Sequence, residues 1–347
     1  MNTQLLERQS PELARAIVDR CFRERPELDL RYGAIGREKC LQDTRFHLQY
    51  LVQAVAAESE ALFLDYVRWA KVMLAGVRVP EKDVVYNLEL MEGAIRDQIG
   101  ESDSQLALGY LRAAIAAVPE MPATSRSFVD TNGRHGLLAI TYLNTVLAGM
   151  RREASELIMR AVDTGTPVRE IYLHVFQPAQ HEIGRLWQTN QISVAQEHYC
   201  TAVTQMIMSQ LYPRILASQK NGKRMLATCV GSELHEIGIR MVADFLELEG
   251  WDTFYLGANT PASAIIKTIK ERRIDCVAIS ATMTYHIELV GNIIKNLRAD
   301  EGTHGVKILV GGYPFNVDKE LWRRIGADGY GSNAEETARV AGKLVGL

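Results

Sequence analysis

The feature that most constrains this chain lies after Gly222, where short apolar runs alternate with amphipathic stretches. Strands that alternate with helices pair in parallel and form a doubly wound sheet with helices on both faces. We therefore predict a Rossmann-like α/β domain over residues 221–347. Its expected strands are 223–230, 254–256, 276–280 and 306–310, and its expected helices are 237–249, 262–272, 287–297, 318–325 and 335–347.

Ligands of such sheets bind beside the carboxyl ends of the strands, which singles out three loops. A metal-binding imidazole usually donates its second N–H to a carboxylate, and Glu233 stands two residues before His235. Taken singly, a loop histidine can be solvated, a serine can cap a helix and a glycine pair can form a turn. The candidate site residues in these loops are Glu233, His235 and Gly238, then Ser280 and Thr282, then Gly311 and Gly312.

Together, Glu-x-His-x-x-Gly at 233–238, Ser-x-Thr at 280–282 and Gly-Gly at 311–312 form a more specific pattern. It resembles the B12-binding domain of methionine synthase, the corrinoid mutases and the corrinoid sensors. That family has Asp where this chain has Glu233, and Leu where it has Thr282. The resemblance implies that His235 is the lower cobalt ligand, with the nucleotide tail of base-off B12 in a slot. Ser280 would contact the buried base, and Gly311 with Gly312 would leave room for it.

Residues 134–220 are predicted to form a four-helix bundle, with breaks near Gly149, 164–167 and 189–191. Within it, Trp187 precedes the pair Glu197 and His198, which a core tryptophan and a capped helix would also explain. Just before a B12 domain, this spacing resembles the helical cap of B12-dependent light sensors, where these residues contact the group on the upper face of cobalt. Methyl-carrier corrinoid proteins also have a helical cap. The light-sensing repressors have a histidine where this chain has Gln188, so their bis-histidine photoproduct is not expected at this position.

Residues 1–118 show helical periodicity throughout and are followed by a linker rich in proline and hydroxyl residues at 119–133. A helix through this region places a carboxylate, an imidazole and a phenol on one face. Such a face is either a set of satisfied polar groups or a pocket for a planar ligand. A helical, possibly globin-like domain before a cap and a B12 domain resembles the photocobilins, which implies a non-covalent bilin such as biliverdin. The candidate bilin residues are Arg37, Asp43, Arg45, His47 and Tyr50.

Composition excludes several other classes of protein. The net charge is −3 and no helix is dense in lysine and arginine, so we expect no direct binding to DNA. No stretch approaches the roughly 20 apolar residues that cross a bilayer, so no membrane partner is expected. The five cysteines are scattered and form no Cys-x-x-Cys pair, which favours a reducing cytoplasm.

We therefore expect a cytoplasmic B12-binding light sensor that carries adenosylcobalamin, or another alkyl or hydroxo form, and a bilin. Rearrangement of the cap would pass the signal to an unknown protein partner or across a homodimer. We find no independent nucleophile or acid–base pair, so catalysis by the chain itself is not expected. Two alternatives remain: a corrinoid methyl-carrier subunit of a methyltransferase system, and a light-independent B12 sensor.

Overall fold

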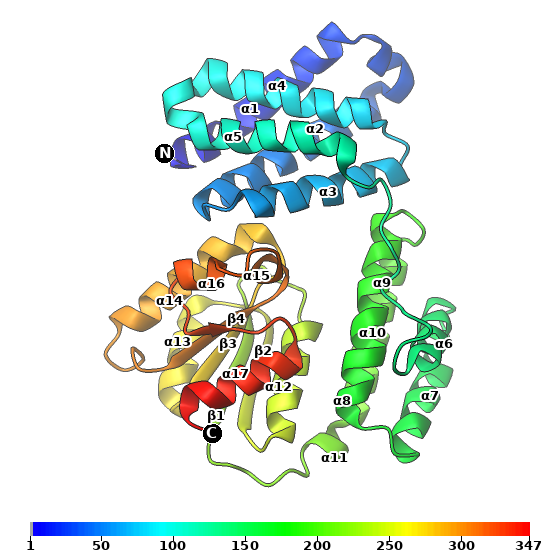
Figure 1. Ribbon diagram of the computed structural model, residues 1–347, viewed down its shortest axis with the longest axis vertical. Coiled ribbons are helices and arrows are strands. Elements are labelled where there is room, and N and C mark those ends of the chain that lie inside the picture. Colours follow the sequence, from blue (N-terminus) through cyan, green and yellow to red (C-terminus); the bar gives the residue numbers. More distant parts are fainter. Residues whose placement is uncertain (1–2) are drawn as a thin grey trace. The chain divides into compact units, whose positions relative to one another are not determined.

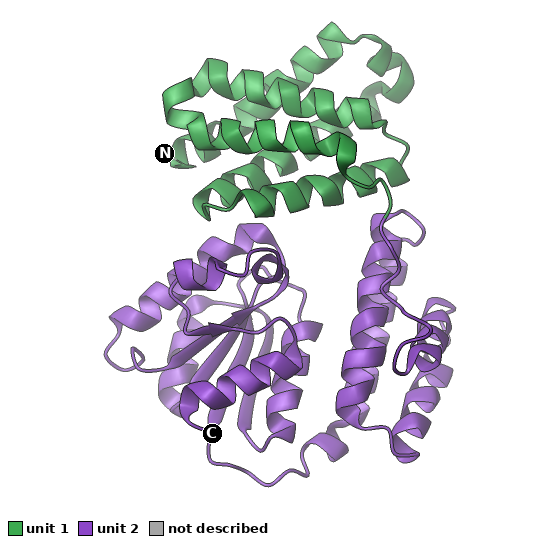
Figure 2. Cartoon of the chain, viewed as in Figure 1, with its two compact units in different colours: residues 1–124 green, residues 125–347 purple. Residues whose placement is uncertain are grey.

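A computed structural model describes residues 3–347, which fall into two compact units, with the division between Thr124 and Ser125 (Figure 2). No helix among these residues is both long and apolar enough to cross a membrane. The first unit consists of helices, whereas the second combines a helical cap with a parallel sheet (Figure 1). The predicted α/β domain and the helical cap before it are therefore confirmed.

Over residues 3–124, the first unit contains five helices and a final 3₁₀ turn. Its second helix bends at Gly33, whose φ of 61° is open to glycine without strain. The globin-like arrangement of this unit stays a prediction. The elements are α1 (Thr3–Glu24), α2 (Glu27–Ala56), α3 (Glu60–Gly76), α4 (Glu81–Ile99), α5 (Glu101–Ala117) and η1 (Val118–Glu120).

The cap has its helix breaks where the sequence predicts them. A π-helical turn, η2, joins α8 to α9, so that residues 168–188 form one long helical rod. The last long helix, α10, starts at a capping box in which Ser193 and Gln196 satisfy each other's backbone N–H groups. The elements are α6 (Gly136–Leu147), α7 (Arg151–Asp163), α8 (Val168–Ile171), η2 (Tyr172–Phe176), α9 (Gln177–Gln188), α10 (Val194–Gln210) and α11 (Tyr212–Ile215).

The segment predicted as a linker is partly packed onto the cap. The backbone N–H of Phe128 donates to a carboxylate oxygen of Glu182 at 2.9 Å, and Val129 is buried in the apolar core of the second unit. Glu182 also binds Arg185 at 2.6 Å, so the side chain that receives the segment is itself held in place. The free connection is therefore shorter than the predicted range 119–133.

The sheet has five parallel strands in the order β2-β1-β3-β4-β5. Buried apolar side chains fill β1 and β3, which is typical of central parallel strands covered on both faces. The strands are β1 (Arg224–Val230), β2 (Asp252–Thr260), β3 (Cys276–Ser280), β4 (Lys307–Gly311) and β5 (Gly329–Tyr330). The helices are α12 (Ile237–Leu248), α13 (Ala262–Arg272), η3 (Thr284–His286), α14 (Ile287–Ala299), α15 (Tyr313–Val317), α16 (Leu321–Arg324) and α17 (Ala334–Val345).

Two predicted elements of this domain have the wrong bounds, and one strand was not predicted. The strand predicted at 254–256 runs over 252–260, because β2 is an edge strand whose half-buried polar residues interrupt the apolar run. The helix predicted at 318–325 is two short helices, the first of which begins earlier, with Pro314 in its first turn. The two-residue strand β5 is too short to leave a pattern in the sequence.

Candidate functional site

The candidate site lies at the carboxyl edge of the sheet, where the strand order reverses. From β1 the chain moves to β2 on one side and later to β3 on the other, so the loops after β1 and β3 are neighbours. This switch point is where open α/β sheets bind ligands. The loop after β1 carries Glu233 and His235, and the loop after β3 carries Thr282.

Glu233 is the centre of the site, and its side chain is fully buried. Its Oε1 accepts hydrogen bonds from the backbone N–H of His235 at 3.0 Å and from Nδ1 of the same residue at 2.6 Å. Its Oε2 accepts from the backbone N–H groups of Thr282 at 2.6 Å and Met283 at 3.1 Å, and from Nδ1 of His286 at 2.9 Å. One carboxylate thus ties both loops together.

These contacts decide the charge of Glu233. Burial alone would raise the pKa of this carboxyl group. The hydrogen bonds from His235, His286 and the backbone outweigh burial, so the net pKa of Glu233 lies well below its usual range. The buried carboxylate is therefore ionised, as an anchor for a metal-binding imidazole must be.

His235 presents its other ring nitrogen away from this anchor. With Nδ1 bonded to Glu233, Nε2 is the nitrogen that can bind a metal, and the side chain is 60% exposed at the edge of the sheet. The hydrogen bond to Glu233 raises the pKa of His235, and the negative charges of Glu233 and of Glu197 in the cap add to this, whereas burial opposes it. A basic, fixed imidazole is the expected form of a strong cobalt ligand.

The glycines of the pattern provide space and close contact. Gly312 has a φ of 104°, and a Cβ on it would lie 2.0 Å from the carbonyl oxygen of Ala281, so only glycine fits. A Cβ on Gly238 would meet nothing within 4 Å, which leaves open space at the start of α12. Ser280 ends β3 as a buried residue paired in register with Gly311 of β4. The pattern residues therefore lie in loops at the same carboxyl edge of the sheet.

The site fits a base-off cobalamin in three respects. A fixed imidazole offers Nε2, open space lies beside Gly238, and the backbone of β3 and β4 comes close at Ser280 and Gly311 without bulky side chains. The loop also exposes Leu234, whose side chain is 73% accessible next to His235 and offers an apolar contact to a planar macrocycle. His235, Ser280 and the glycines are the residues that would hold the cofactor.

The cap places its candidate residues at the ends of α9 and α10. Trp187 lies in the last turn of α9 and is 40% exposed. In the first turns of α10, Glu197 accepts hydrogen bonds from Thr201 at 2.9 Å and from Nδ1 of His198 at 2.5 Å. The negative charge of Glu197 contributes to the raised pKa of His235, which is consistent with the start of α10 lying near the sheet loop. His198 remains largely exposed.

The candidate bilin residues fall into two groups in the first unit. His47 is buried, and its Nδ1 lies 2.7 Å from the hydroxyl of Tyr66, whose ring stacks on Tyr50 at 3.7 Å between centroids. Arg37 pairs with Asp19 at 2.8 Å beside a surface groove of about 440 Å³ between α1 and α2. The half-buried Asp43 has a pKa raised by burial, and Arg45 is exposed. The structure therefore does not bring all five residues to one cavity.

One residue of the site has no counterpart in our sequence analysis. His286 is buried in η3 and shares the Glu233 carboxylate with His235. Its position six residues after Ser280 is visible in the sequence, but only the fold shows that both histidines reach the same carboxylate.

Comparisons with known proteins agree with this geometry. Residues 223–339 match a family model described as a B12 binding domain, and residues 139–212 match a second model with the same description. The dimethylamine corrinoid protein 1 of Methanosarcina acetivorans is 30% identical over 139 residues, which are 40% of this chain and 63% of that protein. The dimethylamine corrinoid protein 3 of Methanosarcina mazei is also 30% identical over 139 residues, which are 81% of its length.

Among solved structures, the monomethylamine corrinoid protein of Methanosarcina barkeri has the same fold. Its TM-score is 0.54 at 21% identity, and the match covers 61% of this chain and 100% of that one. Fold and site thus define a cobalamin-binding protein with a helical cap and a Rossmann-like domain. The chain belongs to the family of B12-binding corrinoid proteins.

Proposed function

We propose that this chain is a corrinoid carrier that holds cobalamin through Nε2 of His235 and presents it to a separate methyltransferase. The observation that carries the proposal is the Glu233–His235 pair, with its 2.6 Å contact, at the switch point of the sheet. The likeness to dimethylamine corrinoid proteins supports this reading, which our sequence analysis held as an alternative, better than it supports the light sensor.

When bound, the corrinoid cobalt supplies the atom that accepts and gives up a methyl group. The chain's own contribution is to bind the corrinoid, to orient its lower ligand and to shield its faces. Glu233 fixes the tautomer and orientation of His235, and the slot at Ser280, Gly311 and Gly312 would take the displaced nucleotide tail. Trp187 and Glu197 would flank the opposite face of the macrocycle.

The carrier is tested by loading the chain with methylcobalamin and following its visible spectrum in the dark. We expect a stable base-off spectrum that changes only when a candidate methyltransferase and its methyl acceptor are added. Loss of the methyl group in the dark without any partner, or no transfer to any methyltransferase tested, would contradict the carrier.

The light sensor is the second candidate, and the cap is the observation in its favour. Trp187 lies in the last turn of α9 and the Glu197–His198 pair in the first turns of α10, and their spacing along the chain supports the comparison with a light-sensing cap. In the first unit, the stacked rings of Tyr50 and Tyr66 with His47 form a polar aromatic cluster that a tetrapyrrole could contact. A red absorption band after addition of biliverdin, together with a light-driven spectral change, would favour this candidate. The light-independent B12 sensor predicts the same change of shape on B12 binding in dark and light.

A further inference from the structure

The cap helix α10 runs alongside α12, the helix that starts directly after the His235 loop. Nε2 of Gln205 donates to Oε1 of Glu236 at 2.9 Å, and four residues on, Arg240 donates to the hydroxyl of Ser209 at 2.8 Å. The two helices therefore run in the same direction, with Gln205 level with the start of α12. Residues 194–204 of α10, which precede Gln205, extend beyond that start. At 1.5 Å per residue this overhang measures roughly 15 Å, and it carries Glu197 and His198 beyond the carboxyl edge of the sheet.

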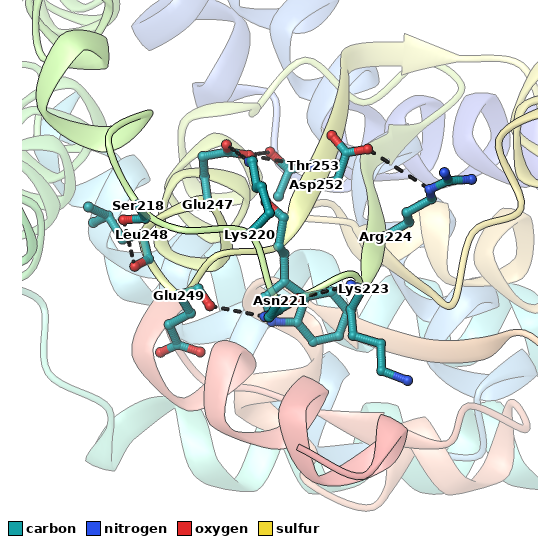
Figure 3. A network of polar contacts seen from close by, with 11 residues as sticks. Ser218, Lys220, Asn221, Lys223, Arg224, Glu247, Leu248, Glu249, Asp252 and Thr253 are labelled. Carbon is teal, nitrogen blue, oxygen red and sulfur yellow. Dashed lines mark hydrogen bonds and ion pairs between the residues drawn. The ribbon is translucent and has the colours of Figure 1, made fainter.

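The opposite end of this interface is firmly attached. Tyr172 donates to the buried Asp244 at 2.7 Å, and Arg169 pairs with Glu249 at 3.1 Å. The connecting chain after α11 is also pinned to the end of α12 and the start of β2 (Figure 3). There Lys220 binds Glu247 and donates to the carbonyl of Trp251 at 2.7 Å, while Ser218 and Asn221 donate to the carbonyls of Leu248 and Glu249 at 3.0 Å each.

Fewer hydrogen bonds hold the cap at the end of the interface nearest the cofactor loop. Glu236 is only half-buried, and its Oε2 is committed to β2 through the Tyr255 hydroxyl at 2.7 Å and the Ala258 N–H at 3.0 Å. Its Oε1 accepts the hydrogen bond from the Gln205 side chain, and the backbone carbonyl of Gln205 accepts a second bond from Arg240 of α12 at 3.1 Å. Releasing the Gln205 side chain therefore leaves Glu236 with its sheet partners and Arg240 on the Gln205 carbonyl, whereas the far end of the cap keeps its buried contacts.

We propose that Glu236 is a positioning residue that latches the cap over the cofactor face through Gln205. The inference rests on the proposed function, in which a partner protein must reach a face that the overhang of α10 covers. Opening then breaks the Gln205–Glu236 bond together with the bonds from Arg240 to Gln205 and Ser209, and the cap moves about its attachment at Asp244 and the connecting chain. Because Glu236 follows His235 directly, the same loop holds the lower ligand and the cap.

The test introduces like charges at the latch. In Gln205→Glu a carboxylate faces the carboxylate of Glu236, and the hydrogen bond is lost. We expect backbone hydrogen exchange over residues 194–204 to accelerate roughly tenfold, as expected for loss of one charge-assisted bond. Exchange in β1 and β3 should not change. The matched control is Gln210→Glu on the same helix, which adds the same charge but can still accept the hydrogen bond from Ser155.

The exchanged pair Gln205→Glu with Glu236→Gln distinguishes a latch from a general loss of structure. The new amide at position 236 can accept from Tyr255 and Ala258 through its carbonyl and donate its N–H to the new carboxylate at position 205, so the overhang should return to its original exchange rate. A wild-type rate in Gln205→Glu, or a fast rate that persists in the exchanged pair, would overturn the proposal. Measurements on the full chain with and without hydroxocobalamin separate the two claims, because the exchange readout does not require methyl transfer.

Discussion

Oε1 of Glu233 lies 2.6 Å from Nδ1 of His235, while Oε2 of the same carboxylate binds His286 and two backbone N–H groups of the next loop. The imidazole proposed as the cobalt ligand is therefore fixed through a buried charge rather than through packing, since its own side chain is 60% exposed. Changes at Glu233 should act on cofactor binding through this fixed orientation.

Glu233→Gln keeps the shape of the side chain but removes the charge and puts an amide donor against an imidazole. We expect the affinity for hydroxocobalamin to fall by roughly 10- to 100-fold, as for other partners of metal-binding histidines. Titration followed by the corrinoid absorption measures this. The control Glu288→Gln, at an exposed position in α14, should bind like the wild type. Equal affinities of the two variants would contradict the anchoring role.

Substitution by alanine should have opposite effects on the stability of the fold at two glycines of the site. Gly312→Ala puts a Cβ 2.0 Å from the Ala281 carbonyl at a φ of 104°, so we expect a loss of stability. Strain of this kind costs on the order of 1–3 kcal/mol or more. Gly238→Ala meets no atom within 4 Å, and in the first turn of α12 it should stabilise the fold by up to about 0.5–1 kcal/mol.

The same Gly238→Ala variant should bind cobalamin less tightly, because its methyl group enters the space assigned to the cofactor. Denaturant unfolding and corrinoid titration of both variants check the pair. Unchanged affinity in a stabilised Gly238→Ala would show that the slot does not pass over this position.

Asp244, where the cap is attached, should give the second unit a distinctive pH response. Burial raises the pKa of Asp244 to about 6, against hydrogen bonding from Tyr172 and the charge of Arg240 that lower it, while Glu247 adds to the rise. Because the folded state binds this proton more tightly, the contribution is fully present below the ordinary aspartate pKa and is lost as pH rises through about 6. The ionised form then costs on the order of 3 kcal/mol.

Asp244→Asn keeps an acceptor for Tyr172 and removes the charge. We expect this variant to exchange more slowly than the wild type in α12 at pH 8, and at nearly the same rate near pH 4. Asp252→Asn, at an exposed position, serves as the control. A variant that is less protected than the wild type at pH 8 would show that the ionised form of Asp244 stabilises the interface.

The first unit should respond to pH in the opposite direction. Burial lowers the pKa of His47 to about 4, so its folded form is neutral, with Nδ1 against the Tyr66 hydroxyl. A lowered histidine pKa means that the unfolded chain binds the proton more tightly, so stability is lost as pH falls from about 6.5 through 4. His47→Gln should flatten this acid response in exchange measurements on α2 and α3, and an unchanged acid response would assign it to other groups.

The sequence predicted the B12 domain, and it made His235 the candidate ligand, because local signals sufficed there. Buried runs such as 276–280 mark central strands, and a histidine after such a run, two residues beyond a carboxylate, already defines the chemistry. His286 was missed because its link to His235 runs through Glu233, across two loops that only the sheet brings together. Glu236 was missed for the same reason, since its partner Gln205 belongs to another domain of the fold.

The first unit was harder to predict because a polar helix face does not show what covers it. The stripe with His47 and Tyr50 suggested a ligand pocket, whereas the structure packs both residues against Tyr66. The helical periodicity of the sequence is also continuous at Gly33, so it does not indicate the bend that the structure has there.

The central claim is that Nε2 of His235 binds the cobalt of a base-off cobalamin. The most direct measurement is the electron paramagnetic resonance spectrum of the full chain loaded with cob(II)alamin, for protein grown with ordinary nitrogen and with ¹⁵N-histidine. We predict hyperfine splitting from one axial nitrogen that changes with the ¹⁵N label and disappears in His235→Ala. A splitting that is the same with and without the ¹⁵N-histidine label, or that is still present in His235→Ala, would contradict the account.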